Sequence, residues 1–166
     1  MQFNIHELHE WDEAIAEIET AAVELPWSQA NLASCFSPSY RVFGLYREPQ
    51  PQLIGYLILH QTLADEWTIM NIVVAPAFQR QGIGTHLVDY VCQLAQQQGA
   101  CIWLEVRESN QVAIRLYQRL GFMYRGSRND YYPTATGQRE AAVLMCWEPT
   151  HHGSRRRGIA GTKFGL

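Results

Sequence analysis

Apolar and polar residues follow two different periods from the start of this chain. Phe3 to Leu8 alternates with a period of two, which predicts a strand. Asp12 to Val23 repeats its apolar residues every three or four positions, which predicts an amphipathic helix. Ser28 suits the N-cap of a second, shorter helix over about Gln29 to Phe36. The chain therefore opens with a strand and two helices that must cover an apolar surface.

Three strands are predicted next. Tyr40 to Tyr46 and Leu53 to His60 are apolar runs, and the segment between them holds two prolines and no hydrophobic residue, as in a hairpin. A polar turn then leads into Trp67 to Val74, the third strand of an antiparallel meander. Ala75-Pro76 ends that strand, because proline cannot donate to a strand ladder.

The second half of the chain alternates helices with strands. His86 to Gln98 is amphipathic, and Gly99 is a natural helix stop. Cys101 to Val106 is an apolar strand, and after a helix of this length we expect it to pair parallel with the preceding strand through a right-handed crossover. Asn110 to Leu120 is a shorter helix that ends at Gly121.

Two closing strands complete the prediction. Phe122 to Arg125 and Ala141 to Trp147 are expected to pair antiparallel, joined by a connection over Gly126 to Glu140. The predicted order is β-α-α-β-β-β-α-β-α-β-β. This order predicts an α/β fold, with a mixed and mostly antiparallel sheet, a central parallel strand pair and flanking helices.

Length and composition favour one compact domain in a reducing compartment. The chain has 166 residues and is 47% hydrophobic, enough for a sizeable core. No apolar run reaches membrane-spanning length and the first residues lack a signal-peptide pattern, so we expect a soluble cytoplasmic protein with no membrane partner. The four cysteines are widely spaced in apolar segments and are expected to be buried thiols: Cys35, Cys92, Cys101 and Cys146. The six histidines do not cluster with ligand spacing, so no metal is predicted.

The charges divide the chain unevenly. Residues 1–28 carry seven acids and no lysine or arginine, whereas residues 151–166 carry four basic residues and no acid. The first 150 residues therefore have a net charge of −7, against −3 for the whole chain. Such a surface favours a cationic partner over nucleic acid, although an acidic helix face is also a common solvated surface. We expect a domain over residues 1–149 and a flexible, basic, glycine-rich tail over 150–166. A solvated tail is favoured over a tail that binds ribosomal RNA or an acidic surface.

A glycine loop over Gln79 to Thr85 joins the third meander strand to the following helix. Gly82 and Gly84 let the main chain approach an anion closely, the helix N-terminus supplies free N–H groups, and Arg80 adds positive charge. The spacing matches neither a Walker loop nor a dinucleotide fingerprint. The loop itself is equally compatible with a tight strand-to-helix turn.

The loop resembles the pyrophosphate-binding loop of the GNAT family of N-acetyltransferases, with its Gln/Arg-x-x-Gly-x-Gly/Ala pattern. Three further segments carry the same resemblance at the expected distances, and it covers nearly all of residues 1–149: Asn71 to Pro76, Trp103 to Asn110, and Ala113 to Phe122. The resemblance implies a GNAT fold and acetyl transfer from acetyl-CoA to an amine by direct attack in a ternary complex. It also implies the residues that bind acetyl-CoA: Ile72, Val73 and Val74 for the acetyl carbonyl and pantetheine arm, Arg80, Gln81, Gly82, Ile83, Gly84 and Thr85 for the pyrophosphate, and Asn110 for a contact with the cofactor beside Glu105. Asn110 also suits the N-cap of its helix.

Two residues are candidates for the proton transfers. Glu105 is a carboxylate inside an apolar strand, which is costly without a use, so it is the candidate base that accepts the ammonium proton through water. The alternative is a side chain at a strand edge that points to solvent. The resemblance implies that Tyr117 is the acid that protonates the coenzyme A thiolate; the helical pattern alone favours a core tyrosine.

The acceptor residues also come from the resemblance. Leu25, Pro26 and Trp27 correspond to one edge of the acceptor slot, although ordinary packing of the tryptophan is as compatible with the pattern. Tyr131 and Tyr132 correspond to the aromatic wall in the loop before the last strand. Leu-Glu-Val-Arg-x-Ser-Asn, Tyr-Tyr-Pro and Pro-Trp-Ser are similar to a bacterial subgroup that acetylates the N-terminal alanine of ribosomal protein bS18. Asp130 departs from that subgroup, which runs Arg-Asn directly into Tyr-Tyr.

Two other functions remain open. The first is a broader acetyltransferase of protein N-termini or small amines. The second is a non-catalytic sensor that binds coenzyme A, which would need the glycine loop but not both Glu105 and Tyr117.

Overall fold

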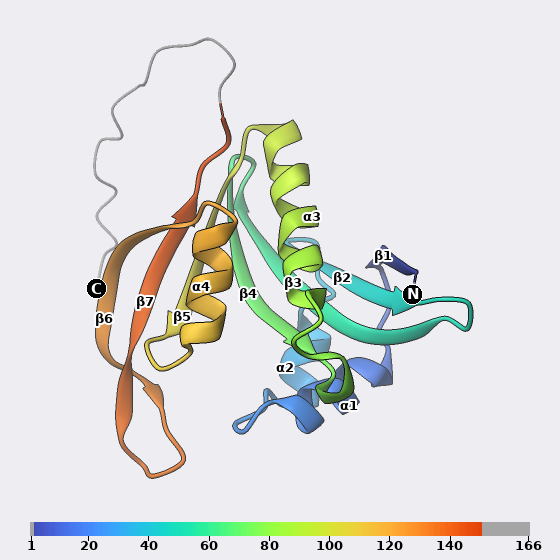
Figure 1. Ribbon diagram of the computed structural model, residues 1–166, viewed down its shortest axis with the longest axis horizontal. Coiled ribbons are helices and arrows are strands. Elements are labelled where there is room, and N and C mark those ends of the chain that lie inside the picture. The colour runs from blue at the N-terminus through green and yellow to red at the C-terminus, as the bar shows by residue number, and fades with distance from the viewer. Residues whose placement is uncertain (1, 151–166) are drawn as a thin grey trace.

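The computed structural model describes residues 2–150. It shows a seven-stranded sheet with helices on both faces (Figure 1). Its strands are β1 (Phe3–Leu8), β2 (Tyr40–Arg47), β3 (Gln52–Leu63), β4 (Glu66–Val74), β5 (Cys101–Arg107), β6 (Met123–Pro133) and β7 (Arg139–Trp147). Its α-helices are α1 (Glu13–Ala22), α2 (Gln29–Ser34), α3 (Ile83–Gln98) and α4 (Gln111–Arg119), with a 3₁₀ turn, η1, at Pro76–Phe78. The predicted order of elements is confirmed.

The sheet has the strand order β1-β2-β3-β4-β5-β7-β6. Every neighbouring pair is antiparallel except β4 and β5, which are parallel and are connected by α3. The α/β fold predicted from the sequence, with one central parallel pair in a mostly antiparallel sheet, is therefore confirmed.

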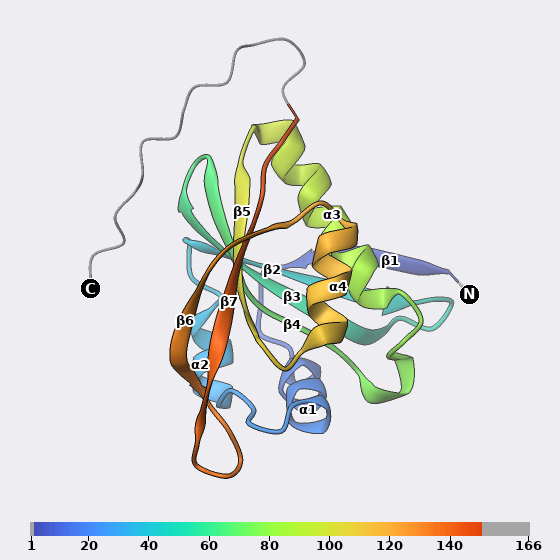
Figure 2. The same cartoon turned by 60° about the vertical axis from the view of Figure 1, so that its left-hand side comes forward.

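Two apolar cores hold the layers together. One lies between the sheet and α3 with α4, where α3 buries Leu87, Val88 and Val91 completely. The other lies on the opposite face, where α1 and α2 cover β2, β3 and β4 and bury Ile15 and Leu32. Figures 1 and 2 show the helices divided between the two faces in this way. Both faces of the central strands are therefore apolar, which explains their nearly continuous hydrophobic sequences.

The helix starts follow the caps that the sequence predicts. The Asp12 carboxylate accepts a hydrogen bond from the Ala14 amide at 2.9 Å, and Ser28 Oγ accepts one from the Asn31 amide at 3.1 Å. Each of these caps satisfies a free N–H group in the first turn. The helix α3 begins at Ile83, three residues before the amphipathic run identified in the sequence, because Gly82 starts it from a left-handed conformation with φ of 79°.

The predicted length of the sixth strand was wrong. The strand expected over Phe122 to Arg125 extends as β6 to Pro133, so Tyr131 and Tyr132 lie within a strand and not in a loop. Pairing with β7 continues to Pro133↔Arg139, and a bulge between Arg128 and Tyr132 takes up the residues that have no partner. The prediction ended the strand too early because Gly126 and Asp130 are typical of turns, whereas irregular positions in β6 allow both within a paired strand.

All four cysteines are free thiols. Three are buried as predicted, whereas the prediction was wrong for Cys101, which is partly exposed. Within residues 2–150, no group of three His, Cys, Asp or Glu side chains could hold a metal ion. None of the helices in this range combines the length and apolarity that crossing a bilayer requires. The predicted tail lies outside the described residues except for Thr150, which exchanges hydrogen bonds with Gln96 of α3 at 2.9 Å.

Candidate active site

The two parallel strands stop pairing halfway along their length. Their ladder runs from Glu66↔Cys101 to Ile69↔Leu104 and no further within the described residues, although β4 continues to Val74 and β5 to Arg107. Met70 is bulged on β4, since β3 pairs Ile58 with Asn71 but Leu59 with Ile69. A bulge increases the local twist and bends a strand away from its neighbour. The facing edges of β4 and β5 beyond this point keep backbone groups that their shared ladder does not use.

The glycine loop lies at the end of the same β4 edge. Gln79 Nε2 donates to the Val74 carbonyl at 3.1 Å, and Gln81 Nε2 donates to the Ala77 carbonyl at 3.2 Å, which holds the loop against η1. Arg80 has a φ of 60° and an exposed side chain. The loop therefore brings the free N–H groups of the α3 N-terminus and the exposed Arg80 next to the end of β4, where β4 no longer pairs with β5, and this arrangement suits an anion.

Few side chains lie close to the backbone at the start of α3. A Cβ added to Gly82 would meet nothing within 4 Å, and one added to Gly84 would meet only Leu116, at 3.6 Å, and two other side chains at ordinary contact distances. Ile83 points into the core and is 1% exposed. Of the residues predicted to bind the pyrophosphate, Ile83 can therefore contribute only its backbone.

Glu105 lies on β5, beyond the last paired residue of the parallel ladder. Its carboxylate forms an ion pair with Arg128 of β6, with 3.2 Å between Oε1 and Nε. The Glu105 side chain is 21% exposed, and Arg128 is 49% exposed. The alternative of a fully solvated edge residue does not hold, since Glu105 is only partly accessible and is paired.

The tyrosine pair of β6 covers the same region. The Tyr132 hydroxyl donates to the Glu105 carbonyl at 3.3 Å, and the two tyrosine rings make an edge contact with centroids 4.9 Å apart. The Arg107 guanidinium carbon lies 4.6 Å from the centroid of the Tyr132 ring, and that of Arg128 lies 5.2 Å from the Tyr131 ring. Burial, followed by the nearby charge of Glu105, raises the pKa of Tyr132 to about 12. The structure therefore brings Glu105, Tyr131 and Tyr132 together.

Tyr117 lies on the face of β5 opposite to the Glu105 side chain, in the core with Leu104 and Val106. It lies on α4, is 5% exposed, and packs against Phe122 with ring centroids 5.5 Å apart. Burial raises the pKa of Tyr117 well above its usual value, and Tyr132 adds to this rise. Tyr117 thus keeps its hydroxyl proton at neutral and moderately alkaline pH, and it belongs to the core as its helical pattern indicates.

Asn110 performs the capping role that the sequence left open. Its Oδ1 accepts a hydrogen bond from the Ala113 amide at 3.1 Å at the start of α4. The amide NH₂ group of Asn110 remains available for another contact.

The connection between α1 and α2 holds the other predicted acceptor residues. Leu25 is 43% exposed, Pro26 is exposed and Trp27 is partly buried. The backbone N–H of Trp27 donates to the buried Glu19 carboxylate at 2.8 Å. In Figures 1 and 2 this connection and the β6–β7 hairpin lie at the same end of the molecule. The fold therefore places these three residues at the same end as the tyrosine pair.

Sequence reasoning missed the two arginines that hold the site. Arg107 donates to the Pro133 carbonyl at 2.8 Å and forms an ion pair with Glu140 at 3.1 Å, which fastens β6 and β7 to β5. Arg128 pairs with Glu105. No short-range pattern reveals these contacts, because they join strands that are far apart in the sequence, and those between β5 and β6 pass across β7, which lies between them in the sheet. Arg107 did give one signal, since it follows Glu105 by two positions and must share its face of β5.

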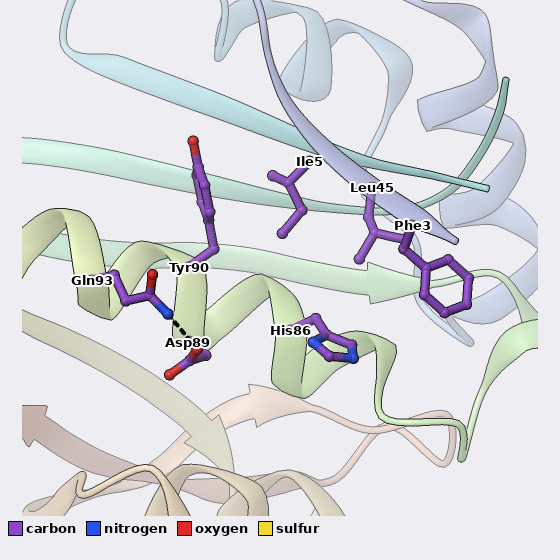
Figure 3. A pocket seen from close by; sticks show the side chains of 7 residues that line it. All are labelled: Phe3, Ile5, Leu45, His86, Asp89, Tyr90 and Gln93. Atoms are coloured by element: carbon purple, nitrogen blue, oxygen red, sulfur yellow. Dashed lines mark hydrogen bonds between the residues drawn. The ribbon is translucent and has the colours of Figure 1, made fainter. Parts of the chain in front are cut away.

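A separate groove lies between β1 and α3 (Figure 3). Phe3, Ile5 and Leu45 line one side, and residues of α3 including His86 and Tyr90 line the other. None of the residues predicted for catalysis or binding lines it.

One known family matches most of the described chain. The model of the acetyltransferase (GNAT) family matches residues 5–122. The protein belongs to the GNAT family. This membership agrees with the strand gap beside a glycine loop and confirms the resemblance seen in the sequence.

Relatives within the GNAT family cover most of the chain. It is 41% identical over 130 residues to the [ribosomal protein bS18]-alanine N-acetyltransferase of Haemophilus ducreyi, covering 78% of this chain and 88% of the relative. It is 39% identical over 133 residues to the enzyme of the same name from Escherichia coli strain K12, covering 80% and 87%. The crystal structure of the Escherichia coli ribosomal-protein-S18-alanine N-acetyltransferase superposes with a TM-score of 0.82 at 34% identity, covering 94% of this chain and 99% of that one.

Proposed function

We propose that this protein transfers the acetyl group of acetyl-CoA to a protein N-terminus, and that its acceptor is the N-terminal alanine of ribosomal protein bS18. The observation that carries the proposal is the position of Glu105 directly after the last paired residue of the β4–β5 ladder, together with Tyr117, which is buried in the core that β5 also lines. The names of relatives at 41% and 39% identity support the same acceptor. Ribosomal proteins are made and assembled in the cytoplasm, so we propose that compartment for the reaction.

Acetyl-CoA fits the gap and the loop by its chemistry. Its pyrophosphate is an anion that matches the free N–H groups of Gly82 to Thr85 and the charge of Arg80. Its pantetheine arm carries amide groups that match the unpaired edge of Ile72 to Val74. A carbonyl bound by backbone N–H groups of that edge is polarised for attack. Asn110 is proposed to contact the same substrate with its free amide group.

The reaction joins the acceptor nitrogen to the acetyl carbon and breaks the bond between that carbon and sulfur. Glu105 accepts the proton that the N-terminal ammonium must lose, through a bridging water, and later releases it to solvent. The nitrogen loses a second proton to solvent as the amide forms, while Tyr117 supplies the proton for the departing thiolate and is then reprotonated from solvent. Burial raises the pKa of Tyr117, so the phenol still holds its proton when the thiolate departs. Direct attack in a ternary complex needs no covalent enzyme intermediate.

The acceptor is proposed to lie between two walls. Leu25, Pro26 and Trp27 form one wall, and Tyr131 with Tyr132 forms the other. An extended N-terminus fits between aromatic walls of this kind, because its backbone remains free to hydrogen-bond while its first side chain meets apolar surface.

Mass spectrometry tests the proposal. A synthetic peptide that copies the N-terminus of bS18 is incubated with acetyl-CoA and the protein, beside matched peptides that begin with Ser, Met and Pro and a panel of polyamines and aminoglycosides. A gain of roughly 42 Da on the alanine peptide alone supports the proposed acceptor. Transfer to several peptides or to small amines would indicate a broader acetyltransferase. Coenzyme A binding without transfer to any acceptor would favour the sensor.

A further inference from the structure

Glu19 is the one charged side chain that is buried among residues 2–150, with 1% of its surface exposed. It lies on the apolar face of α1, beside Ile15 and Ile18, and faces the sheet. Burying a carboxylate costs free energy unless hydrogen bonds or an opposite charge replace its water. Within the described residues no arginine or histidine forms an ion pair with Glu19. Hydrogen bonds must therefore take the place of that water.

Three donors from three different segments meet at this carboxyl group. Oε1 accepts the backbone N–H of Trp27 at 2.8 Å. Oε2 accepts the Tyr56 hydroxyl and the Asn71 side-chain amide, the latter at 3.2 Å. The Asn71 amide also lies 3.5 Å from the Tyr56 hydroxyl oxygen. All of the partners are donors, so the carboxyl group acts only as an acceptor. Oε1 binds the connection between α1 and α2, and Oε2 binds β3 and β4.

Two of the donors belong to the segments proposed to bind the acceptor and the acetyl group. Trp27 belongs to the connection that forms one wall of the acceptor slot. Asn71 follows the bulge at Met70 and directly precedes Ile72, the start of the edge proposed to bind the acetyl carbonyl. Tyr56 is a fully buried residue of β3 that stands between them and fixes the carboxyl group in place. Glu19 is therefore the only side chain in the described residues that hydrogen-bonds to both the acceptor connection and β4.

We propose that Glu19 is a positioning residue that holds the acceptor-binding connection at a fixed distance from the acetyl-binding edge of β4. This inference rests on the proposed function, since it assumes that the connection binds the acceptor. An acceptor loop that is already ordered spends less binding free energy on ordering, and an amine held at the correct distance reacts faster. Glu19 itself does not touch the reacting atoms.

Replacing the carboxylate by its amide tests the inference at constant size. In Glu19→Gln, one acceptor oxygen becomes an NH₂ donor, so it must face either the Trp27 N–H or the Tyr56 and Asn71 donors. We expect the KM for the alanine peptide to rise by about tenfold or more, with kcat within about threefold and the KM for acetyl-CoA within about twofold. Hydrogen exchange of the Trp27 amide, followed by NMR without any substrate, is expected to be about tenfold faster.

Matched variants separate positioning from loss of charge or of fold. Glu17→Gln removes the same charge from the exposed side of α1 and is expected to behave as the wild type. Asn71→Asp in the Glu19→Gln background restores one acceptor opposite one donor, so it is expected to return the Trp27 exchange rate and the peptide KM toward wild type. If Glu19→Gln does not fold, Tyr56→Phe, which removes one of the three donors, is expected to raise the same KM by a smaller factor.

The outcomes distinguish the inference from the proposed function. A wild-type protein that acetylates no peptide contradicts the proposed function, while the exchange rate of the Trp27 amide still reports whether Glu19 holds the connection. An unchanged peptide KM together with unchanged Trp27 exchange in folded Glu19→Gln overturns the inference. It is also overturned if the KM values for peptide and acetyl-CoA rise equally, or if the double variant is no better than Glu19→Gln.

Discussion

Glu105 and Arg128 form the ion pair on which the proposed proton transfer depends. Glu105→Gln keeps the size of the side chain but cannot accept a proton, so kcat with the alanine peptide is expected to fall by about 10²-fold or more. Acetyl-CoA affinity, measured by calorimetry, is expected to stay unchanged, because the proposed contacts to that substrate lie on β4 and the glycine loop. Glu108→Gln, at an exposed position just beyond β5, is the matched control. Full turnover by the Glu105→Gln variant would remove Glu105 from its proposed role.

Tyr117 offers a second test of single-residue chemistry. Tyr117→Phe removes only the hydroxyl group. The ring, which packs against Phe122 and is 5% exposed, is kept. We expect kcat to fall by about 10²-fold, with the melting temperature changed little, because the phenol is proposed to serve the leaving group. Tyr124→Phe, at a position 61% exposed, is the control for loss of a tyrosine hydroxyl. Equal kcat values for the two variants would leave Tyr117 as a core residue alone.

The sequence predicted some of these residues and missed others for a physical reason. Glu105 could be identified because a carboxylate inside an apolar strand is unusual. Glu19 carried the same kind of signal, since it falls on the apolar face of α1 with Ile15 and Ile18, but two of its three partners come from distant segments, β3 and β4. Arg128 gave no signal, because its pairing with Glu105 depends on the register of β5, β7 and β6.

The start of α3 allows a prediction at the scale of an element. Gly82 has a left-handed φ of 79°, whereas Gly84 lies in the first turn of the helix. Gly82→Ala is therefore expected to destabilise the protein by about 1 kcal/mol, because L residues are strained in this conformation. Gly84→Ala is expected to stabilise it by up to about 1 kcal/mol, since its Cβ meets only ordinary contacts, the nearest at 3.6 Å. Urea unfolding of the two variants measures both effects, and equal changes would contradict the assigned conformations.

Elements with a clear period were predicted well, and those shaped by tertiary pairing were not. The helices α1 and α3 follow their apolar spacing, and the parallel pairing of β5 with β4 follows from the length of the helix between them. The strand β6 was cut short in the prediction because Gly126 and Asp130 are typical of turns. Both residues do have positive φ angles, but they occupy irregular positions of a strand that β7 keeps in the sheet.

At the scale of the whole molecule, the site is assembled by the sheet. The proposed residues come from the α1–α2 connection, β4, the glycine loop, β5, α4 and β6, and no single element holds enough of them to act alone. The two cores on opposite faces keep these elements in register. Any condition that unfolds the sheet is therefore expected to abolish the proposed activity and the fold together.

Alkaline pH is such a condition. Burial raises the pKa of four tyrosines above the usual 10.0, namely Tyr46, Tyr56, Tyr117 and Tyr132. Between pH 10 and the higher pKa of the folded state, the unfolded chain has lost these protons while the folded chain retains them. Stability is therefore fully present below pH 10 and is lost as the pH rises, by up to about 1.4 kcal/mol per pH unit for each phenol.

Urea unfolding between pH 9 and 11.5 measures this loss. The chain has a single lysine, Lys163, so lysine titration adds little in this range. The Cys101 thiol, whose pKa is lowered to about 7 mainly by a hydrogen bond with Cys146, acts with the opposite sign between pH 7 and 9, below the range of the test. Tyr56→Phe removes one of the four phenols, so its free energy of unfolding is expected to fall with pH less steeply than that of the wild type, by about 1.4 kcal/mol per pH unit. Parallel curves for the two proteins would show that Tyr56 titrates alike in the folded and unfolded chains, and would contradict the effect of its burial.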